Sequence, residues 1–101
     1  MSQHLTVIAQ LRAKPGQETA LREALTALVP PTLAEPGCIT YDLHRAVDDH
    51  GSFHFYEVWS SPEEHAANLK TPHLRSFLAR SADLLAGDIQ VTLLHRLAPR
   101  S

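Results

Sequence analysis

The apolar residues of this chain recur with two spacings, and breaks that contain Gly and Pro separate the stretches that carry them. Leucines at helical spacing predict one helix over residues 18–34, which ends near Pro30-Pro31 or shortly beyond, because a proline pair disrupts a helix interior. Alternating positions rich in β-branched and aromatic residues predict four strands, over 4–13, 38–46, 52–59 and 89–97.

A second helical region follows the third predicted strand. Ser61, with Pro62 after it and Glu64 three residues on, forms a capping-box signature, so we expect a helix to begin there. This helix runs to about Leu69 and is interrupted at Thr71-Pro72. Helical spacing of leucines then resumes and lasts until Gly87.

The order β-α-β-β-α-β predicts an α+β domain with the ferredoxin-like split β-α-β arrangement: a four-stranded antiparallel sheet with helices on one face. Alternation in the second strand assigns Ile39 and Tyr41 to the same face. The helices cover only one face of the sheet. Because the other face carries Ile8, Val58 and Leu94, we expect a homodimer that packs through it.

Length and composition narrow the class of protein. The chain has 101 residues, which suits a single domain over 1–101, and its 44% apolar and 20% charged residues are ordinary for a globular protein. A net charge of −2 without a basic run argues against nucleic acid or anionic lipid as a partner. No apolar run approaches the length of a membrane helix. Cys38 is the only cysteine and the first residues lack signal-peptide features, so a cytoplasmic protein is expected.

Three segments together resemble one known family. These are LTVIAQLRAKPGQE (Leu5–Glu18), AEPGCITYDLHRAVDD (Ala34–Asp49) and FHFYEVWSSPEEHAANLKTPHLRSF (Phe53–Phe77), and they resemble antibiotic biosynthesis monooxygenase domains, which include quinol monooxygenases. The resemblance implies a ferredoxin-like homodimer that oxidises a quinol or polyphenolic aromatic substrate with O₂. It also implies that no metal, flavin or haem cofactor is held, because the electron-rich substrate itself reduces O₂.

Trp59 and Glu57 are the first candidates for such chemistry. The resemblance places a Trp beside the pocket at position 59, although a lone Trp in a small domain is ordinarily a core residue. If Trp59 faces the helices, alternation puts Glu57 and Phe55 on that face as well. Glu57 is then either a base whose pKa burial has raised, or, in the more ordinary case, a salt-bridge partner of Arg12 or Arg96.

The helical region supplies further candidates. His73, in a TPHL motif, is either a general base, since an unperturbed imidazole titrates near neutral pH, or a capping residue at a helix start. His65 is close enough in sequence to approach it. Asn68 stands where the family frequently has His, and its amide can donate a hydrogen bond to a phenolate. We expect the substrate to contact four side chains: Phe55, Tyr41, His65 and Phe77.

Other chemistries find less support in the sequence. The seven histidines include no HExxH motif or other tight spacing, so no metal site is expected, and Cys38 is read as a small buried hydrophobe. A haem-degrading relative would use an Asn on the first strand, whereas Asn68 is the first Asn here. A non-catalytic module that binds a small aromatic ligand remains open, since fold alone does not fix function.

Overall fold

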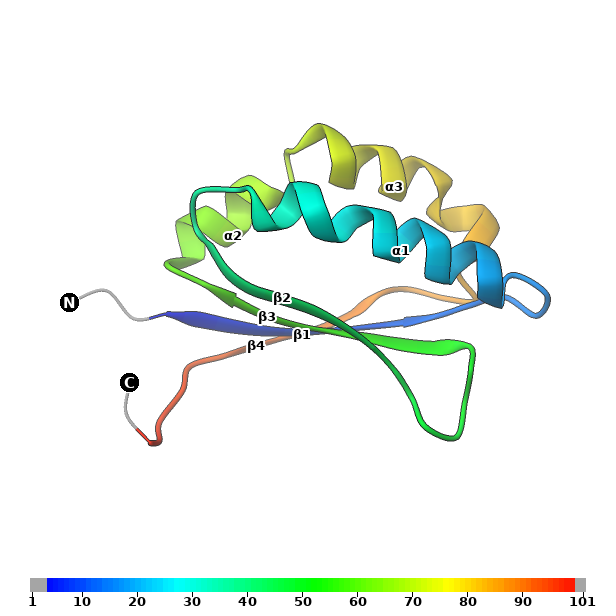
Figure 1. Ribbon diagram of the computed structural model, residues 1–101, viewed down its shortest axis with the longest axis horizontal. Helices are drawn as coiled ribbons and strands as arrows, with labels where there is room; N and C mark the ends of the chain where they lie inside the picture. The colour runs from blue at the N-terminus through cyan, green and yellow to red at the C-terminus, as the bar shows by residue number, and fades with distance from the viewer. Residues whose placement is uncertain (1–3, 100–101) are drawn as a thin grey trace.

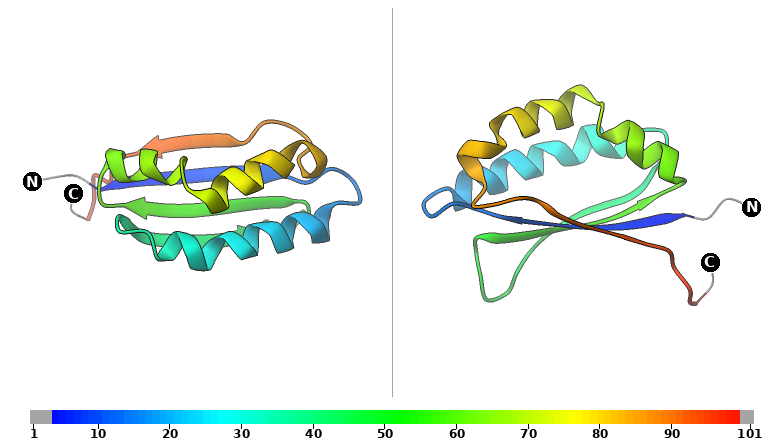
Figure 2. Two further views of the ribbon diagram at one scale, coloured as in Figure 1. Left: turned by 90° about the horizontal axis from the view of Figure 1, so that it is seen from above. Right: turned by 180° about the vertical axis from the view of Figure 1, so that it is seen from behind.

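A computed structural model describes residues 4–99 of the chain and shows four antiparallel strands with three helices on one face of the sheet (Figures 1 and 2). The strand order is β2-β3-β1-β4, so the two central strands are β3 and β1. This confirms the α+β ferredoxin-like prediction. In chain order the elements are β1 (Leu5–Arg12), α1 (Glu18–Leu33), β2 (Cys38–Arg45), β3 (Ser52–Trp59), α2 (Pro62–Asn68), α3 (Pro72–Leu84) and β4 (Gln90–Leu94).

Side-chain caps start the second and third helices where the sequence predicts them. Ser61 Oγ accepts a hydrogen bond of 3.2 Å from the backbone N–H of Glu64, and Thr71 Oγ1 accepts one of 3.4 Å from Leu74. A Pro follows each cap, at a position where the missing N–H costs no helical bond. The predicted interruption between α2 and α3 is therefore confirmed.

The proline pair does not end α1, which continues through Pro30 and Pro31 to Leu33. Without N–H groups, the two prolines leave the carbonyls of Thr26 and Ala27 without their helical donors. Both of these residues are exposed, so water can satisfy the two carbonyls. The pair is tolerated because it affects the solvent side of the helix.

Helix α3 ends earlier than the sequence predicts, at Leu84 and not at Gly87. The backbone of Leu85 is extended and pairs with Ala13 just beyond β1. The next residue, Ala86, donates a hydrogen bond of 2.8 Å to the carbonyl of Arg12. Pairing with the end of β1 thus replaces the last predicted turn of the helix.

The predicted facing of β2 is wrong at Ile39. The register against β3 shifts between Cys38 and Thr40, so Ile39 is an extra residue in a β-bulge. Its side chain is 48% exposed, whereas Tyr41 is buried under the helices. A bulge reverses the facing of every residue on one side of it, which simple alternation does not anticipate.

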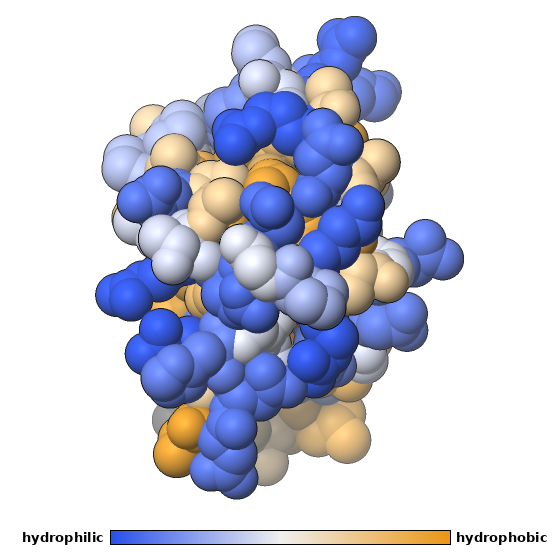
Figure 3. All heavy atoms as spheres, turned by 90° about the vertical axis from the view of Figure 1, so that its right-hand side faces the viewer, coloured by the Kyte–Doolittle hydropathy of each residue, from blue (hydrophilic) through white to orange (hydrophobic). Residues whose placement is uncertain are grey.

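The core lies between the sheet and the helices and is built from leucines of α1, aromatic residues of β3 and the inward side chains of β1. Polar residues cover most of the end of the molecule that carries the β1–α1 turn, with apolar residues visible between them (Figure 3). Strand β4 differs from the other strands because all five of its residues are exposed, and no helix lies over it (Figure 2).

Candidate active site

A cavity of about 180 Å³ lies between the sheet and the helices, and it reaches the surface where its lining residues Leu69, Leu78 and Val91 are exposed. Its sheet wall comes from all four strands, including Tyr41 of β2, Phe55 and Glu57 of β3, and Val91 of β4, while all three helices contribute the opposite wall. Almost all of the lining is apolar. An apolar protein cavity of about 150 Å³ is large enough for benzene, so this one can hold a substituted aromatic ring.

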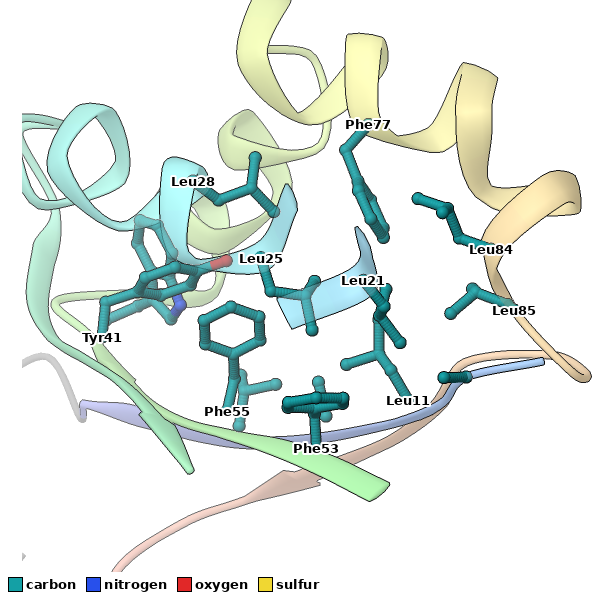
Figure 4. Close-up of a cluster of buried hydrophobic side chains, with 14 of the residues drawn as sticks. Leu11, Leu21, Leu25, Leu28, Tyr41, Phe53, Phe55, Phe77, Leu84 and Leu85 are labelled. Carbon is teal, nitrogen blue, oxygen red and sulfur yellow. The ribbon is translucent and has the colours of Figure 1, made fainter. Parts of the chain in front are cut away.

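Aromatic residues shape the cavity from both sides (Figure 4). Tyr41 and Phe55 stack with their ring centroids 4.4 Å apart and their planes at 26°. Phe77 points from α3 down toward the sheet, on the opposite side (Figure 4). The three residues line the cavity together with His65, and these four are the residues that we expect to contact the substrate.

Glu57 places a carboxyl group in this apolar setting. The residue is only 5% exposed, and its Oε1 accepts a hydrogen bond of 2.9 Å from Nε1 of Trp59. Burial raises the pKa of Glu57 to about 7; the Trp59 hydrogen bond opposes this shift and the negative charge of Glu35 adds to it. A carboxyl group with a pKa near 7 can take up or release a proton at neutral pH.

The predicted salt bridge of Glu57 with Arg12 or Arg96 is wrong. Arg12 instead pairs with Asp49, at 2.7 Å between Nη2 and Oδ2, near the turn between β2 and β3. Arg96 is exposed and lies beyond β4. The alternation of β3 puts Glu57 under the helices, on the same face as Trp59. There the indole N–H of Trp59 donates a hydrogen bond to Glu57.

Three other titratable groups near Glu57, those of Tyr41, His65 and Cys38, have pKa values shifted toward their neutral forms. Burial, followed by the charge of Glu57, raises the pKa of the Tyr41 hydroxyl well above its usual range. Burial lowers the pKa of His65, whose ring lies 5.8 Å from that of Trp59. Cys38 is half-buried, and burial, with the charges of Glu35 and Glu57, raises the pKa of its thiol to about 11, so it is not a thiolate nucleophile.

Asn68 and His73 meet at a carboxylate that the sequence did not single out. Oε2 of Glu35 accepts a hydrogen bond of 2.8 Å from Asn68 Nδ2 and lies 2.7 Å from Nε2 of His73. Asn68 also lines the cavity, whereas His73 and Glu35 do not. From the sequence we expect His65 to approach His73, but each contacts a different residue. The ring of His65 lies beside Trp59, and His73 contacts Glu35.

The structure therefore divides the predicted catalytic residues into two groups. Glu57 and Asn68 line the cavity, whereas Trp59 and His73 do not. Trp59 is 0% exposed and donates a hydrogen bond to Glu57, and His73 contacts Glu35. The missed residue is Glu35. Its only sequence signal is the Glu-Pro-Gly turn, which reads as a helix stop and says nothing of where the side chain points.

Two further features bear on the class of protein. Within residues 4–99, no three His, Cys, Asp or Glu side chains lie close enough together to share a metal ion. Within the same range, no helix has both the length and the apolar character needed to cross a membrane.

Known proteins resemble this chain in both sequence and fold. The profile of the family described as "Antibiotic biosynthesis monooxygenase" matches residues 4–80. The solved structure of PA3566 from Pseudomonas aeruginosa superposes with a TM-score of 0.92 at 38% identity, covering 97% of this chain and 98% of that one. For Rv0793 of Mycobacterium tuberculosis, the TM-score is 0.89 at 33% identity, with 97% and 99% covered.

Among curated sequences, YgiN of Escherichia coli (strain K12), named a probable quinol monooxygenase, is 33% identical over 98 residues, covering 86% of this chain and 94% of YgiN. The Synechocystis protein sll1783 is longer: at 27% identity over 89 residues, this chain spans 60% of its length. The family match extends over most of the chain, and most of the residues that line the cavity lie within the matched range. This chain belongs to the antibiotic biosynthesis monooxygenase family.

Proposed function

We propose that this protein is a monooxygenase that oxidises a quinol or related polyphenol with O₂ and holds no cofactor of its own. Family membership supports a monooxygenase, and the name of YgiN suggests the quinol class. The observation that carries the proposal is the Glu57 carboxyl, which is buried in an aromatic-sized apolar cavity with a pKa raised to about 7.

Glu57 is the proposed general base. Trp59 occupies its Oε1, which leaves Oε2 to accept a proton from a substrate hydroxyl. A phenol with a pKa of about 10 is about 3 units weaker as an acid than Glu57, so the proton transfer costs about 4 kcal/mol. That is a small part of the roughly 16 kcal/mol barrier that corresponds to a turnover of about 10 per second.

The electrons for the reaction come from the substrate. The quinol anion gives an electron to O₂, and the two radicals combine at a ring carbon to form a peroxide anion. Protonated Glu57 returns its proton to this anion, which gives a hydroperoxide. Loss of water then leaves a hydroxyquinone, so one oxygen atom enters the ring, the other leaves as water, and the quinol supplies all four electrons. Apolar walls favour this sequence because they exclude water from the radical pair.

Two neutral side chains are proposed to stabilise the developing phenolate. The Tyr41 hydroxyl stays protonated because its pKa is raised, and the residue pairs with Glu57 in the register of β2 against β3. The second Nδ2 hydrogen of Asn68 is free for a ligand, since the amide makes one side-chain hydrogen bond within residues 4–99. His73 is not favoured as the base because it lies outside the cavity wall.

The test is oxygen uptake by chelator-treated protein with hydroquinones, naphthohydroquinones and anthrones, each corrected for autoxidation. Glu57→Gln should reduce kcat at least a hundredfold, as expected for loss of a general base, while His73→Gln should retain most of kcat. Equal loss in both variants would argue against Glu57 as the base. Ligand binding without oxygen uptake by the wild type would indicate a non-catalytic aromatic-binding module.

We further propose that the protein acts as a homodimer packed through the sheet face away from the helices. That face carries Ile8, Val58 and Leu94, and Leu94 is 44% exposed in the single chain. Leu94→Glu should dissociate the dimer in sedimentation equilibrium, whereas Val47→Glu, on the exposed turn after β2, should not. A wild-type chain that sediments as a monomer would refute the proposal.

A further inference from the structure

Glu35 lies in the short connection between α1 and β2, and its backbone is fixed on both sides. Its N–H donates to the carbonyl of Thr32 at 3.0 Å, and its own carbonyl accepts from Cys38 at 3.1 Å. Pro36 follows it and restricts the backbone further. The carboxylate is therefore presented from a rigid base, with its side chain only 11% exposed.

The partners of this carboxylate belong to two different helices. Asn68 is the last residue of α2 and His73 is the second residue of α3, and the Oε2 atom of Glu35 contacts both. Between them lies the break at residues 69–71, where Thr71 Oγ1 donates a hydrogen bond of 2.8 Å to the Asn68 carbonyl. Glu35 thus ties the junction of two helices to the α1–β2 connection.

The junction forms part of the cavity wall. Asn68, Leu69 and Leu74 all line the cavity, and they lie within or directly beside the segment that Glu35 holds. Leu69 is 52% exposed, so little packing outside the cavity fixes its position. The hydrogen bonds of Glu35 to Asn68 and His73 join this stretch to the α1–β2 connection.

We propose that Glu35 is a positioning residue of this cavity: its carboxylate joins Asn68 and His73 across the break between α2 and α3, and so fixes the helical wall and the Asn68 amide against the substrate. The predicted effect of Glu35 on turnover rests on the proposed function, whereas its predicted effect on the position of Asn68 and the helical wall does not. Glu35 does not itself line the cavity, so it acts through Asn68.

The charge of Glu35 also reaches the proposed base. It raises the pKa of Glu57, and it contributes to the raised pKa values of Tyr41 and Cys38. Together with His65 from α2, these are the titratable groups that surround Glu57 beneath the helices. Removal of the Glu35 charge should therefore lower the pKa of Glu57 and move the acid limb of kcat/KM to lower pH.

Asn68 is the only asparagine in the chain, which makes a direct test possible. In the NMR spectrum of protein labelled with ¹⁵N-asparagine, one side-chain NH₂ group appears, as a pair of proton signals. A hydrogen bond to a carboxylate shifts one of these two signals downfield. The signal is compared in wild type, Glu35→Gln, Glu35→Ala and a control, Glu63→Gln, which removes a charge from an exposed position on α2. Oxygen uptake and the dissociation constant of the probe 4-nitrophenol are measured on the same samples.

In Glu35→Ala the downfield Asn68 proton should move upfield and KM should rise roughly tenfold, because Asn68 loses its buried charged partner. Glu35→Gln should shift the acid limb to lower pH, and Glu63→Gln should match the wild type. An unchanged Asn68 signal in Glu35→Ala would overturn the proposal, as would a changed signal with unchanged KM and 4-nitrophenol affinity.

The outcome also separates this proposal from the proposed function. If the wild type consumes no oxygen with any quinol, the monooxygenase proposal fails. The Asn68 signal and the 4-nitrophenol affinity of Glu35→Ala then still decide the positioning role: a weakened affinity supports it, and an unchanged affinity refutes it.

Discussion

The indole N–H of Trp59 donates a 2.9 Å hydrogen bond to the carboxyl of Glu57, two residues earlier on the same face of β3. Both side chains are buried, with exposed fractions of 0% and 5%. The bond stabilises the ionised form of Glu57, whereas burial stabilises the neutral form, and burial is the larger effect. Burial raises the pKa of the proposed base, the hydrogen bond limits that rise, and the bond leaves one carboxyl oxygen available.

Replacement of Trp59 should change the pH dependence of the reaction. Trp59→Phe keeps most of the buried volume but removes the donor, so the pKa of Glu57 should rise and the acid limb of kcat/KM should move to higher pH. The pH profile of kcat/KM with a hydroquinone measures this shift. Tyr56→Phe, on the opposite face of β3, serves as the control, and an unmoved limb in Trp59→Phe would show that the hydrogen bond does not set the pKa.

Glu57 should also make the stability of the protein depend on pH. Its pKa is 4.5 in the unfolded chain and about 7 in the folded one, so the folded state binds more protons between these values. The free energy of unfolding should therefore fall as pH rises from about 4.5 to 7, by up to about 3 kcal/mol, and level off above pH 7. Urea denaturation across this range measures the change.

Glu57→Gln should remove this decline, because the amide does not titrate. The exposed residue Glu63 provides the control, and Glu63→Gln should keep the decline of the wild type. If Glu57→Gln and wild type lose stability in parallel between pH 4.5 and 7, the folded pKa of Glu57 is not raised.

The cavity should select substrates by size. About 180 Å³ suits one ring with small substituents, so we expect hydroquinones to be oxidised with higher kcat/KM than three-ring anthrones. Phe77→Ala should narrow or reverse this preference because it removes a ring from the cavity wall. Its cost in stability is about 3 to 5 kcal/mol.

Leu84→Ala is the matched control for this change. Leu84 is buried on α3 but does not line the cavity, so its truncation should cost about 2 to 5 kcal/mol without altering the preference. The ratio of kcat/KM for a hydroquinone and an anthrone, measured in both variants, gives the answer. An equal change of the ratio in both would mean that general loosening, and not cavity size, controls selectivity.

A side chain at Gly37 should destabilise the fold. A Cβ atom there would lie 2.2 Å from Cβ of Glu64, at the start of α2, while the Gly37 carbonyl accepts a hydrogen bond of 2.8 Å from Ser60. Gly37→Ala should therefore cost about 1 to 3 kcal/mol, because α2 must move. At Gly87 an added Cβ meets nothing within 4 Å, so Gly87→Ala should be nearly neutral in thermal denaturation. Equal melting temperatures for the two variants would contradict the close packing.

The sequence predicts the elements well because local signals act at their ends. Period-two alternation locates β3 at residues 52–59, and the Ser61 cap locates the start of α2. The facing of Trp59, Glu57 and Phe55 under the helices also follows from alternation, and their burial confirms it. The family resemblance is confirmed by the profile match.

Errors arise where a non-local contact decides the outcome. The bulge at Ile39 depends on the register against β3, and the end of α3 depends on pairing between Leu85 and Ala13. The partners of Glu57 and the role of Glu35 depend on side chains that meet across distant elements, since 33 and 38 residues separate Glu35 from Asn68 and His73. Alternation and capping carry no information about such pairs.

Strand β4 has the weakest hold on the rest of the chain. It pairs with β1 alone, all five of its residues are exposed, and yet its Val91 forms part of the cavity wall. Separation of β4 from β1 is therefore the local unfolding event with the lowest expected free energy among the strands of a single chain, and it would remove Val91 from the cavity wall. In a single chain, native-state hydrogen exchange should show the least protection in β4, and the proposed packing of a second copy over Leu94 should raise this protection.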